Sequence, residues 1–225
     1  MSHLIEPIGY IQSPYKEKFA VPRQPGLVTQ AQTRLVLSGD YDSADIVAGL
    51  EEFSHVWLIF GFHQNFAAGW QNKIRPPRLG GNKKVGVFAS RSTFRPNGMG
   101  LSVLPLSTIE YQPSTTLVLS GGDLVDGTPV YDIKPYVGYA DAIFDAKSGY
   151  AQQAPQAPLH VTWAFKPEII ADERQLIEQV LAQDPRPSYR RAKPDNHHYG
   201  VKLLSYNIRF VIENDQCLIT ELTPL

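Results

Sequence analysis

The chain has almost no cysteine. Its 225 residues include only one, Cys217. A single cysteine cannot form a disulfide within the chain, and it excludes a metal site built from several cysteines. Cysteine usage this sparse is typical of proteins in a reducing compartment, so we expect a cytoplasmic protein.

Long apolar runs and a large net charge are missing as well. The longest apolar run, Val56 to Phe62, is far shorter than the roughly 20 residues that span a bilayer, and we expect no membrane partner. Because His3 and Glu6 lie within the first seven residues, these do not read as a signal peptide. The formal net charge is only -1, so any affinity for nucleic acid must come from local basic patches.

Several common motifs are absent. The chain has no GxGxxG after a predicted strand, so a Rossmann nucleotide site is not supported. It also lacks the GxxxxGK[ST] phosphate loop, the HExxH zinc motif and paired CxxC motifs, and we expect no bound metal. Any nucleotide-like ligand must therefore be held by another fold.

Short apolar and alternating segments predict a mainly β protein. One helix is expected from Asp42 or Ser43 through Leu50. Many strands with one short helix favour a closed or strongly curved sheet, a β-barrel, and the segment at 54–64 is apolar enough to be covered on both faces. The strands are expected at residues 4–12, 34–37, 54–64, 84–90, 101–110, 115–120 and 129–134.

Composition divides the chain into two predicted domains. Residues 150–158, YAQQAPQAP, have the composition of a linker. We expect a β-barrel domain over residues 1–150 and a small α+β domain over residues 159–225. In the second domain, Pro167 is expected to open a helix that ends near Ala182, followed by a hairpin at 208–222.

One basic stretch, residues 75–102, carries no acid and is rich in proline and glycine. Such a loop, with phenylalanines between its cations, indicates a surface for an anionic, aromatic partner such as RNA or a nucleotide. The segment DPRPSYRR at 184–191 is a second possible RNA contact, although it could equally be a solvated loop. The candidate RNA-binding residues are Arg75, Arg78, Lys83, Lys84, Arg95, Arg186, Arg190 and Arg191.

Polar residues at strand ends are candidates for chemistry. His63 and Gln64 end the most apolar strand, where a histidine is either a satisfied core residue or a ligand contact. Asp126 precedes a glycine in a turn and is expected to accept backbone hydrogen bonds, whereas Asp123 and Asp132 are better candidates for ligand contact. The spacing of these acids does not match a calcium loop.

Five segments follow one another in order between about residues 5 and 140: IGYIQSPYKEKFAVPRQPGLV, SHVWLIFGFHQ, RPPRLGGN, GVFASRSTFRPN and DLVDGTPVYDIKPY. Through these segments the chain resembles the TsaA/TrmO family of tRNA methyltransferases. The resemblance implies a β-barrel enzyme that uses S-adenosylmethionine and works as a homodimer. Its implied reaction is methylation of N6 of threonylcarbamoyl-adenosine, just 3′ of the anticodon in threonine tRNA. Because the tail resembles family members with a small C-terminal domain, that domain is expected to contact tRNA.

The resemblance also implies residue roles. A carbamoylated adenine has an acidic N–H, so a modest base is enough, and Asp123, Asp132 and His63 are the candidates. The tRNA backbone is expected to contact five basic residues of the 75–102 stretch: Arg75, Arg78, Lys83, Lys84 and Arg95. The implied cofactor contacts are Gln24, Pro25, Gly26, His63, Gln64, Arg91, Leu101 through its backbone, Gly122 and Asp123.

Two other classes of function stay open. One is an RNA-binding module without catalysis, against which the proline-glycine loops and the buried strand end argue. The other is a regulatory protein that binds a small molecule or a metal, favoured only if the acids around Asp123 bind a cation.

Overall fold

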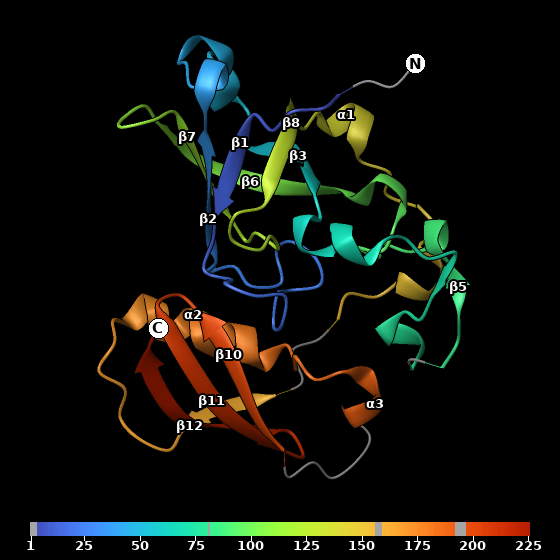
Figure 1. Ribbon diagram of the computed structural model, residues 1–225, viewed down its shortest axis with the longest axis vertical. Helices are drawn as coiled ribbons and strands as arrows, with labels where there is room; N and C mark the ends of the chain where they lie inside the picture. Colours follow the sequence, from blue (N-terminus) through green and yellow to red (C-terminus); the bar gives the residue numbers. More distant parts are fainter. Residues whose placement is uncertain (1–3, 81, 156–158, 192–196) are drawn as a thin grey trace.

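The computed structural model describes residues 4–80, 82–155, 159–191 and 197–225. Six antiparallel strands close a barrel in the order β1-β2-β7-β6-β3-β8, which confirms the predicted fold class (Figure 1). No helix in the described part of the chain is long and apolar enough to cross a membrane. The barrel strands are β1 Gly9–Gln12, β2 Gln32–Leu37, β3 His55–Gly61, β6 Met99–Glu110, β7 Thr116–Ser120 and β8 Pro129–Pro135.

Alternation along the strands builds the barrel core. In β3, Val56, Leu58 and Phe60 are buried inside, while Trp57 and Ile59 are half-buried on the outer face. The prediction that this segment is covered on both faces is therefore wrong. A β-barrel buries its inner face, and these larger outer side chains are only partly covered.

The helix predicted from Asp42 to Leu50 does not form. The segment contains three 3-10 turns, η1 Gly39–Tyr41, η2 Asp45–Val47 and η3 Leu50–Glu52. The Asp42 carboxylate does not cap a helix, because it accepts a hydrogen bond from the Thr115 amide over 2.6 Å. This bond ties the end of η1 to the residue that precedes β7.

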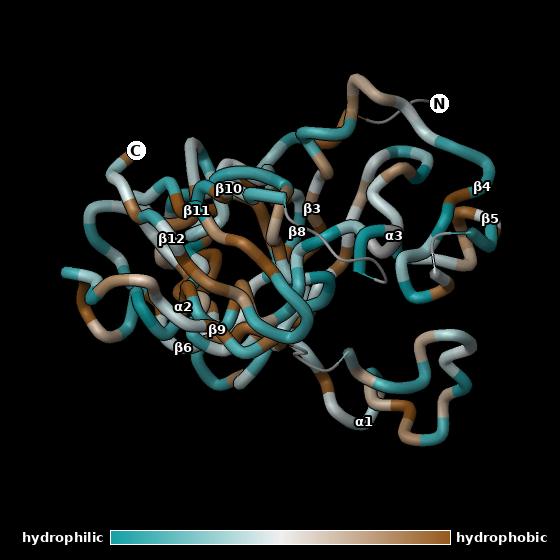
Figure 2. The backbone as a smooth tube through the Cα atoms, turned by 90° about the horizontal axis from the view of Figure 1, so that it is seen from below, coloured by the Kyte–Doolittle hydropathy of each residue, from teal (hydrophilic) through white to brown (hydrophobic). Residues whose placement is uncertain are grey.

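The basic stretch forms a small hairpin and several turns rather than the strand predicted at 84–90. The two-residue strand β4 Lys73–Ile74 pairs with β5 Val85–Gly86. The strand β5 ends at Gly86, because the next three residues, Val87–Ala89, form a 3-10 turn. The other short elements are η4 His63–Ala68, η5 Pro77–Leu79, η6 Val87–Ala89, η7 Pro96–Gly98, α1 Gly138–Asp141, η8 Gly149–Ala151 and α3 Ser188–Arg191. The α1 segment lies at the edge of the molecule in Figure 2, and its Asp141 accepts a hydrogen bond from the Trp57 indole of β3.

A second sheet, ordered β10-β11-β12-β9, packs against helix α2 (Ala171–Ala182). The helix begins four residues later than Pro167, because Ile169 and Ile170 are β-branched, whereas Ala171 is a better helix former. The hairpin is confirmed, but β9, which pairs in parallel with β12, was not predicted. The strands are β9 His160–Trp163, β10 His198–Leu203, β11 Tyr206–Glu213 and β12 Gln216–Pro224.

Residues 13–31 join the two parts of the chain and run between them in Figure 1. Tyr15, Val28 and Ala31 are buried in the same apolar core as α2 and the second sheet. Phe19 stacks on Tyr199, with ring centroids 6.3 Å apart and planes 9° from parallel. Residues 156–158, the end of the predicted linker, lie outside the described residues.

Candidate functional site

The 20–28 loop meets the turn at residues 121–123. The Gly26 amide donates to the Gly121 carbonyl over 2.8 Å, and the Gly121 amide donates to the Ala31 carbonyl over 2.7 Å. Gly121 has a φ of +65°, a conformation that favours glycine. A Cβ added to Gly122 would lie 2.1 Å from the Thr33 hydroxyl, so no side chain fits there. The fold therefore brings together two groups of predicted cofactor contacts.

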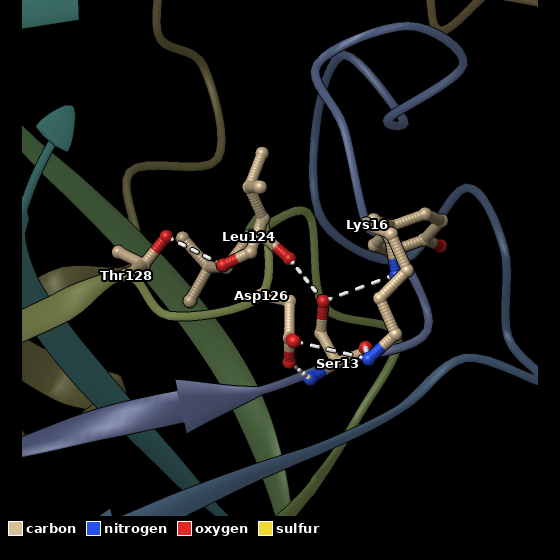
Figure 3. A network of polar contacts seen from close by, with 7 residues as sticks. Ser13, Lys16, Leu124, Asp126 and Thr128 are labelled. Carbon is tan, nitrogen blue, oxygen red and sulfur yellow. Dashed lines mark hydrogen bonds and ion pairs between the residues drawn. The ribbon is translucent and has the colours of Figure 1, made fainter. Parts of the chain in front are cut away.

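A hydrogen-bonded network fixes the chain on both sides of this junction (Figure 3). The Ser13 amide donates to the Asp126 carboxylate over 2.8 Å, and the Ser13 hydroxyl donates to the Leu124 carbonyl over 2.7 Å. The Lys16 ammonium lies 3.0 Å from the same Asp126 carboxylate. Asp126 thus accepts a backbone hydrogen bond, as the sequence predicts, and holds Ser13 and Lys16, which precede the 20–28 loop, against the turn.

Asp123 is the most perturbed carboxyl at the junction. It accepts a hydrogen bond from the Ser102 hydroxyl, which lies on the inner face of β6, over 3.0 Å. Burial raises the pKa of Asp123 to about 6, although the hydrogen bond from Ser102 and the positive charge of Arg91 act in the opposite direction. Burial, and then the charge of Asp123, raise the pKa of the Tyr15 hydroxyl well above its usual value.

Two buried hydroxyls beside this carboxyl have no partner among the described residues, those of Tyr15 and Thr33. A buried polar atom without a partner is costly and points to a missing ligand or water. Together with Asp123 and the Gly26 and Gly122 backbone, these hydroxyls fit a polar ligand that carries hydroxyl and charged groups.

Arg91 closes over the junction from the 90–98 loop. Its guanidinium donates to the side-chain oxygen of Gln24, so the two predicted cofactor contacts touch. Arg91 and Gln24 come from segments far apart in the sequence, and their contact places the basic stretch beside the 20–28 loop.

Two further hydrogen bonds connect η4 to the chain before the 20–28 loop and to the 90–98 loop. The Lys18 ammonium donates to the Asn65 side-chain oxygen over 3.0 Å, and the Asn65 amide group donates to the Thr93 hydroxyl over 2.5 Å. Asn65 is buried, with 7% of its surface exposed. Lys18 and Asn65 were not predicted from the sequence, in which the only signal is a polar residue directly after Gln64.

His63 begins η4 and is half-buried. Burial lowers its pKa, the positive charge of Lys18 lowers it further, and the Gly61 backbone partly offsets both. The imidazole is therefore neutral near pH 7 and able to accept a proton. Lys18 also donates to the Gln64 carbonyl over 3.3 Å, which holds this predicted pair against the loop.

Two predicted residues lie on the outer face of the barrel. In the register of β6, β3 and β8, Leu101 and Asp132 lie on either side of Ile59, and both are exposed. The Asp132 carboxylate accepts a hydrogen bond from the Ile133 amide over 2.9 Å. Asp132 is thus not brought together with Asp123, which bonds to the inner-face residue Ser102. Leu101 directly precedes Ser102, so its backbone stays near the junction.

The predicted RNA contacts of the basic stretch differ in their exposure and in the hydrogen bonds that their side chains already make within the protein. Arg95 is half-buried and donates to the Ser90 and Ser92 carbonyls, so it mainly holds its own loop. Arg78 is exposed but donates to the Gln153 carbonyl over 2.6 Å. The remaining members are exposed around β4 and β5: Arg75, Lys83 and Lys84.

In the 184–191 segment, the structure leaves Arg186 little freedom to contact RNA. Its side chain is 5% exposed and pairs with Asp184 over 2.9 Å. A guanidinium committed to a buried carboxylate cannot also reach a phosphate without opening the pair. Arg190 and Arg191 are half-buried at the end of α3, and Arg191 donates to the Asp184 and Arg186 carbonyls.

Comparison with known proteins confirms the resemblance drawn from the sequence. Residues 10–142 match the tRNA-methyltransferase O N-terminal domain, and residues 157–225 match the TrmO C-terminal domain. A tRNA (adenine(37)-N6)-methyltransferase of Escherichia coli (strain K12) is 47% identical, with 99% of each chain covered. A putative S-adenosylmethionine-dependent methyltransferase RcsF of Pseudomonas aeruginosa is 48% identical, with 93% of each covered.

Solved structures agree with this similarity. A crystal structure of TrmO is 41% identical and superimposes with a TM-score of 0.80, covering 99% of this chain and 100% of the other. A TrmO structure from Pseudomonas aeruginosa is 39% identical with a TM-score of 0.78, covering 99% of each. The two matched domains and the shared fold together show that the chain belongs to the TrmO family, that of tRNA-methyltransferase O.

Proposed function

We propose that this chain transfers the methyl group of S-adenosylmethionine to N6 of threonylcarbamoyl-adenosine, next to the anticodon of threonine tRNA. Membership of the TrmO family supports a tRNA adenine-N6 methyltransferase that depends on S-adenosylmethionine. The observation that carries the proposal is the junction of the 20–28 loop, the 121–123 turn and Arg91, with its unpartnered hydroxyls.

The residues of the junction fit this cofactor. S-adenosylmethionine supplies an activated methyl group when bound, so the protein mainly has to align the acceptor with it. The Asp123 carboxylate would accept hydrogen bonds from hydroxyl or ammonium groups, and the Arg91 guanidinium would pair with a carboxylate. Gly26 is exposed and has open space where a side chain would lie, so its backbone is open to close approach. The partly buried junction would also exclude water from the reacting groups.

His63 is the proton acceptor that the structure supports best. N6 of the adenine loses its proton as it gains the methyl group, and a neutral imidazole can take that proton. His63 is neutral near pH 7 and adjoins Gln64 on η4. We assign Asp123 to the cofactor instead, because it lies within the junction. Asp132 stays a prediction with the least support, since it lies on the outer face.

We also propose that the protein is a homodimer that acts in the cytoplasm. Exposed apolar residues of the α1 segment support self-association, because Tyr139 and Phe144 are 96% and 99% exposed. The Trp57 indole donates to the Asp141 carboxylate over 3.1 Å, which places this segment beside the outer face of β3. Sedimentation of the protein with and without a Tyr139→Ser and Phe144→Ser double change tests this. A monomer in both cases would contradict it.

The proposed reaction has a direct assay. The purified protein is incubated with methyl-labelled S-adenosylmethionine and threonine tRNA that carries or lacks the threonylcarbamoyl group. The tRNA is then digested and the labelled nucleoside is identified by mass spectrometry. We expect label only on threonylcarbamoyl-adenosine. Label on unmodified adenosine, or no label on either tRNA, would contradict the proposed substrate.

A further inference from the structure

A cavity of about 270 Å³ lies where the chain at residues 18–27 meets the end of α2 and the α3 segment. Lys18 and Arg23 contribute to its wall from one side, and Asp184 and Arg191 contribute from the other. Arg23 directly precedes Gln24, which bonds to Arg91 in the candidate cofactor site. The cavity therefore borders that site through the backbone of the 20–28 loop.

The wall of the cavity carries an excess of positive charge. Lys18, Arg23 and Arg191 face one acid, Asp184, among the described lining residues. The Asp184 carboxylate is already paired with the buried guanidinium of Arg186, which donates to both of its oxygens over 2.9 Å. Arg191 interacts with the same carboxylate more weakly, because its Nε lies 3.5 Å from one Asp184 oxygen. Most of the charge on the wall is therefore not neutralised by the protein.

The arginines converge from segments that are remote in the sequence. Burial lowers the pKa of the Arg23 guanidinium, and the charges of Arg191 and Arg78 lower it further, although Asp184 partly compensates. Like charges gathered in this way repel, and a bound anion would relieve the repulsion. Arg191 is also held in place, because it donates to the Asp184 carbonyl over 2.5 Å and to the Arg186 carbonyl over 3.2 Å.

The charge of the cavity, more than its size, selects its occupant. Its volume of about 270 Å³ lies at the small end of the range of about 300–1,000 Å³ that is usual for small-molecule pockets. Guanidinium groups bind phosphates and carboxylates through paired hydrogen bonds. We propose that the cavity is a subsite for one anionic group of the RNA substrate, bound by Arg23 and Arg191. The proposal rests on the proposed function, because that function supplies the RNA.

Two groups on such an RNA share this chemistry. One is a backbone phosphate of the anticodon loop, and the other is the threonine carboxylate of the modified adenosine. The cavity lies beside the candidate cofactor site, where the modified base would have to lie. Both groups are singly charged oxygen anions that a pair of arginines recognises.

The test measures RNA binding by fluorescence anisotropy, without turnover. Three anticodon stem-loop RNAs are compared, which carry threonylcarbamoyl-adenosine, its carboxamide analogue without the carboxylate, or plain adenosine. The variants are Arg23→Gln and Arg191→Gln. The control is Arg209→Gln, a surface change on β11 that removes only an exposed pair with Glu221.

We expect both variants to bind the modified RNA at least about tenfold more weakly, the usual loss for a hydrogen-bonded charged pair. If the carboxylate occupies the cavity, the wild-type protein prefers the carboxylate RNA over the other two, and the variants lose that preference. If a phosphate occupies it, the variants bind all three RNAs more weakly to the same extent, and the salt dependence falls by about one charge. Wild-type affinity of both variants for all three RNAs would overturn the proposal.

Two controls separate this result from other failures. Arg23 is exposed, so Arg23→Gln is expected to fold normally even if Arg191→Gln disturbs α3, and a melting curve checks both. Because binding is measured without methyl transfer, a wild-type protein that binds RNA through Arg23 but labels no base would overturn the proposed function alone.

Discussion

The Asp123 carboxylate accepts a hydrogen bond from the Ser102 hydroxyl over 3.0 Å. This contact attaches the 121–123 turn to the inner face of β6, one residue after Leu101. It holds a carboxyl group in surroundings that disfavour its charge, because burial raises its pKa to about 6. The site is therefore built around an acid whose charge depends on pH near neutrality.

Cofactor affinity should depend on pH through Asp123. The pKa of about 6 lies above the ordinary value, so the carboxyl is mostly protonated at pH 5 and ionised at pH 7. If the ionised form binds the cofactor, affinity should be about tenfold weaker at pH 5 than at pH 7, because roughly a tenth of the group is then charged. Calorimetry with wild-type protein and Asp123→Asn measures this. The variant should bind weakly at both values, and a wild-type affinity that does not change with pH would contradict the role.

Arg91→Ala should abolish cofactor binding. The variant loses the contact with Gln24 and the positive charge beside Asp123. Arg209→Ala, which removes an exposed ion pair on β11, is the matched control and should bind normally. Isothermal titration with S-adenosylmethionine is the measurement, and a normal dissociation constant for the Arg91 variant would remove this residue from the site.

Gly122→Ala should disrupt the turn. The new methyl group would lie 2.1 Å from the Thr33 hydroxyl, so one of the two must move. Forcing an extra group into a packed site costs about 1–3 kcal/mol, and we expect a lower melting temperature together with weaker cofactor binding. Gly138→Ala is the control, because its Cβ would point into open space. Equal melting curves for both variants would show that the turn adapts.

Arg186→Ala should destabilise the protein rather than act on RNA directly. It leaves the Asp184 carboxylate buried with only the more distant Arg191, and breaking a buried pair costs about 3–5 kcal/mol. Thermal melting should show a large loss of stability. Arg190→Ala should instead weaken tRNA binding with cofactor affinity intact. A stable Arg186 variant that has lost only tRNA binding would restore Arg186 as an RNA contact.

Local pattern was enough to predict much of the fold. Alternation located the barrel strands, because each strand buries one face in the same core. The helix at Asp42 was wrong because a distant partner, the Thr115 amide, takes the capping carboxylate. Strand β9 was missed because its pairing with β12 joins residues more than fifty positions apart, which no short pattern reveals.

The same limit applies to the site. The resemblance gave Gln24, Arg91 and Asp123, and the structure brings these residues into one junction. Ser102, Lys18 and Asn65 were missed, because their role lies in contacts between loops that are far apart in the sequence. Arg186 stays a prediction with little support, because it is buried in a pair with Asp184, two residues away, and spacing alone does not reveal that burial.

The most direct test of the central claim is a crystal structure of the protein with S-adenosylhomocysteine bound. We predict density for the ligand at the junction of the 20–28 loop, the 121–123 turn and Arg91, with the Tyr15 or Thr33 hydroxyl within hydrogen-bonding distance of the ligand or a bound water. Density at another place on the barrel, with the junction unchanged and the two hydroxyls still without partners, would contradict the account.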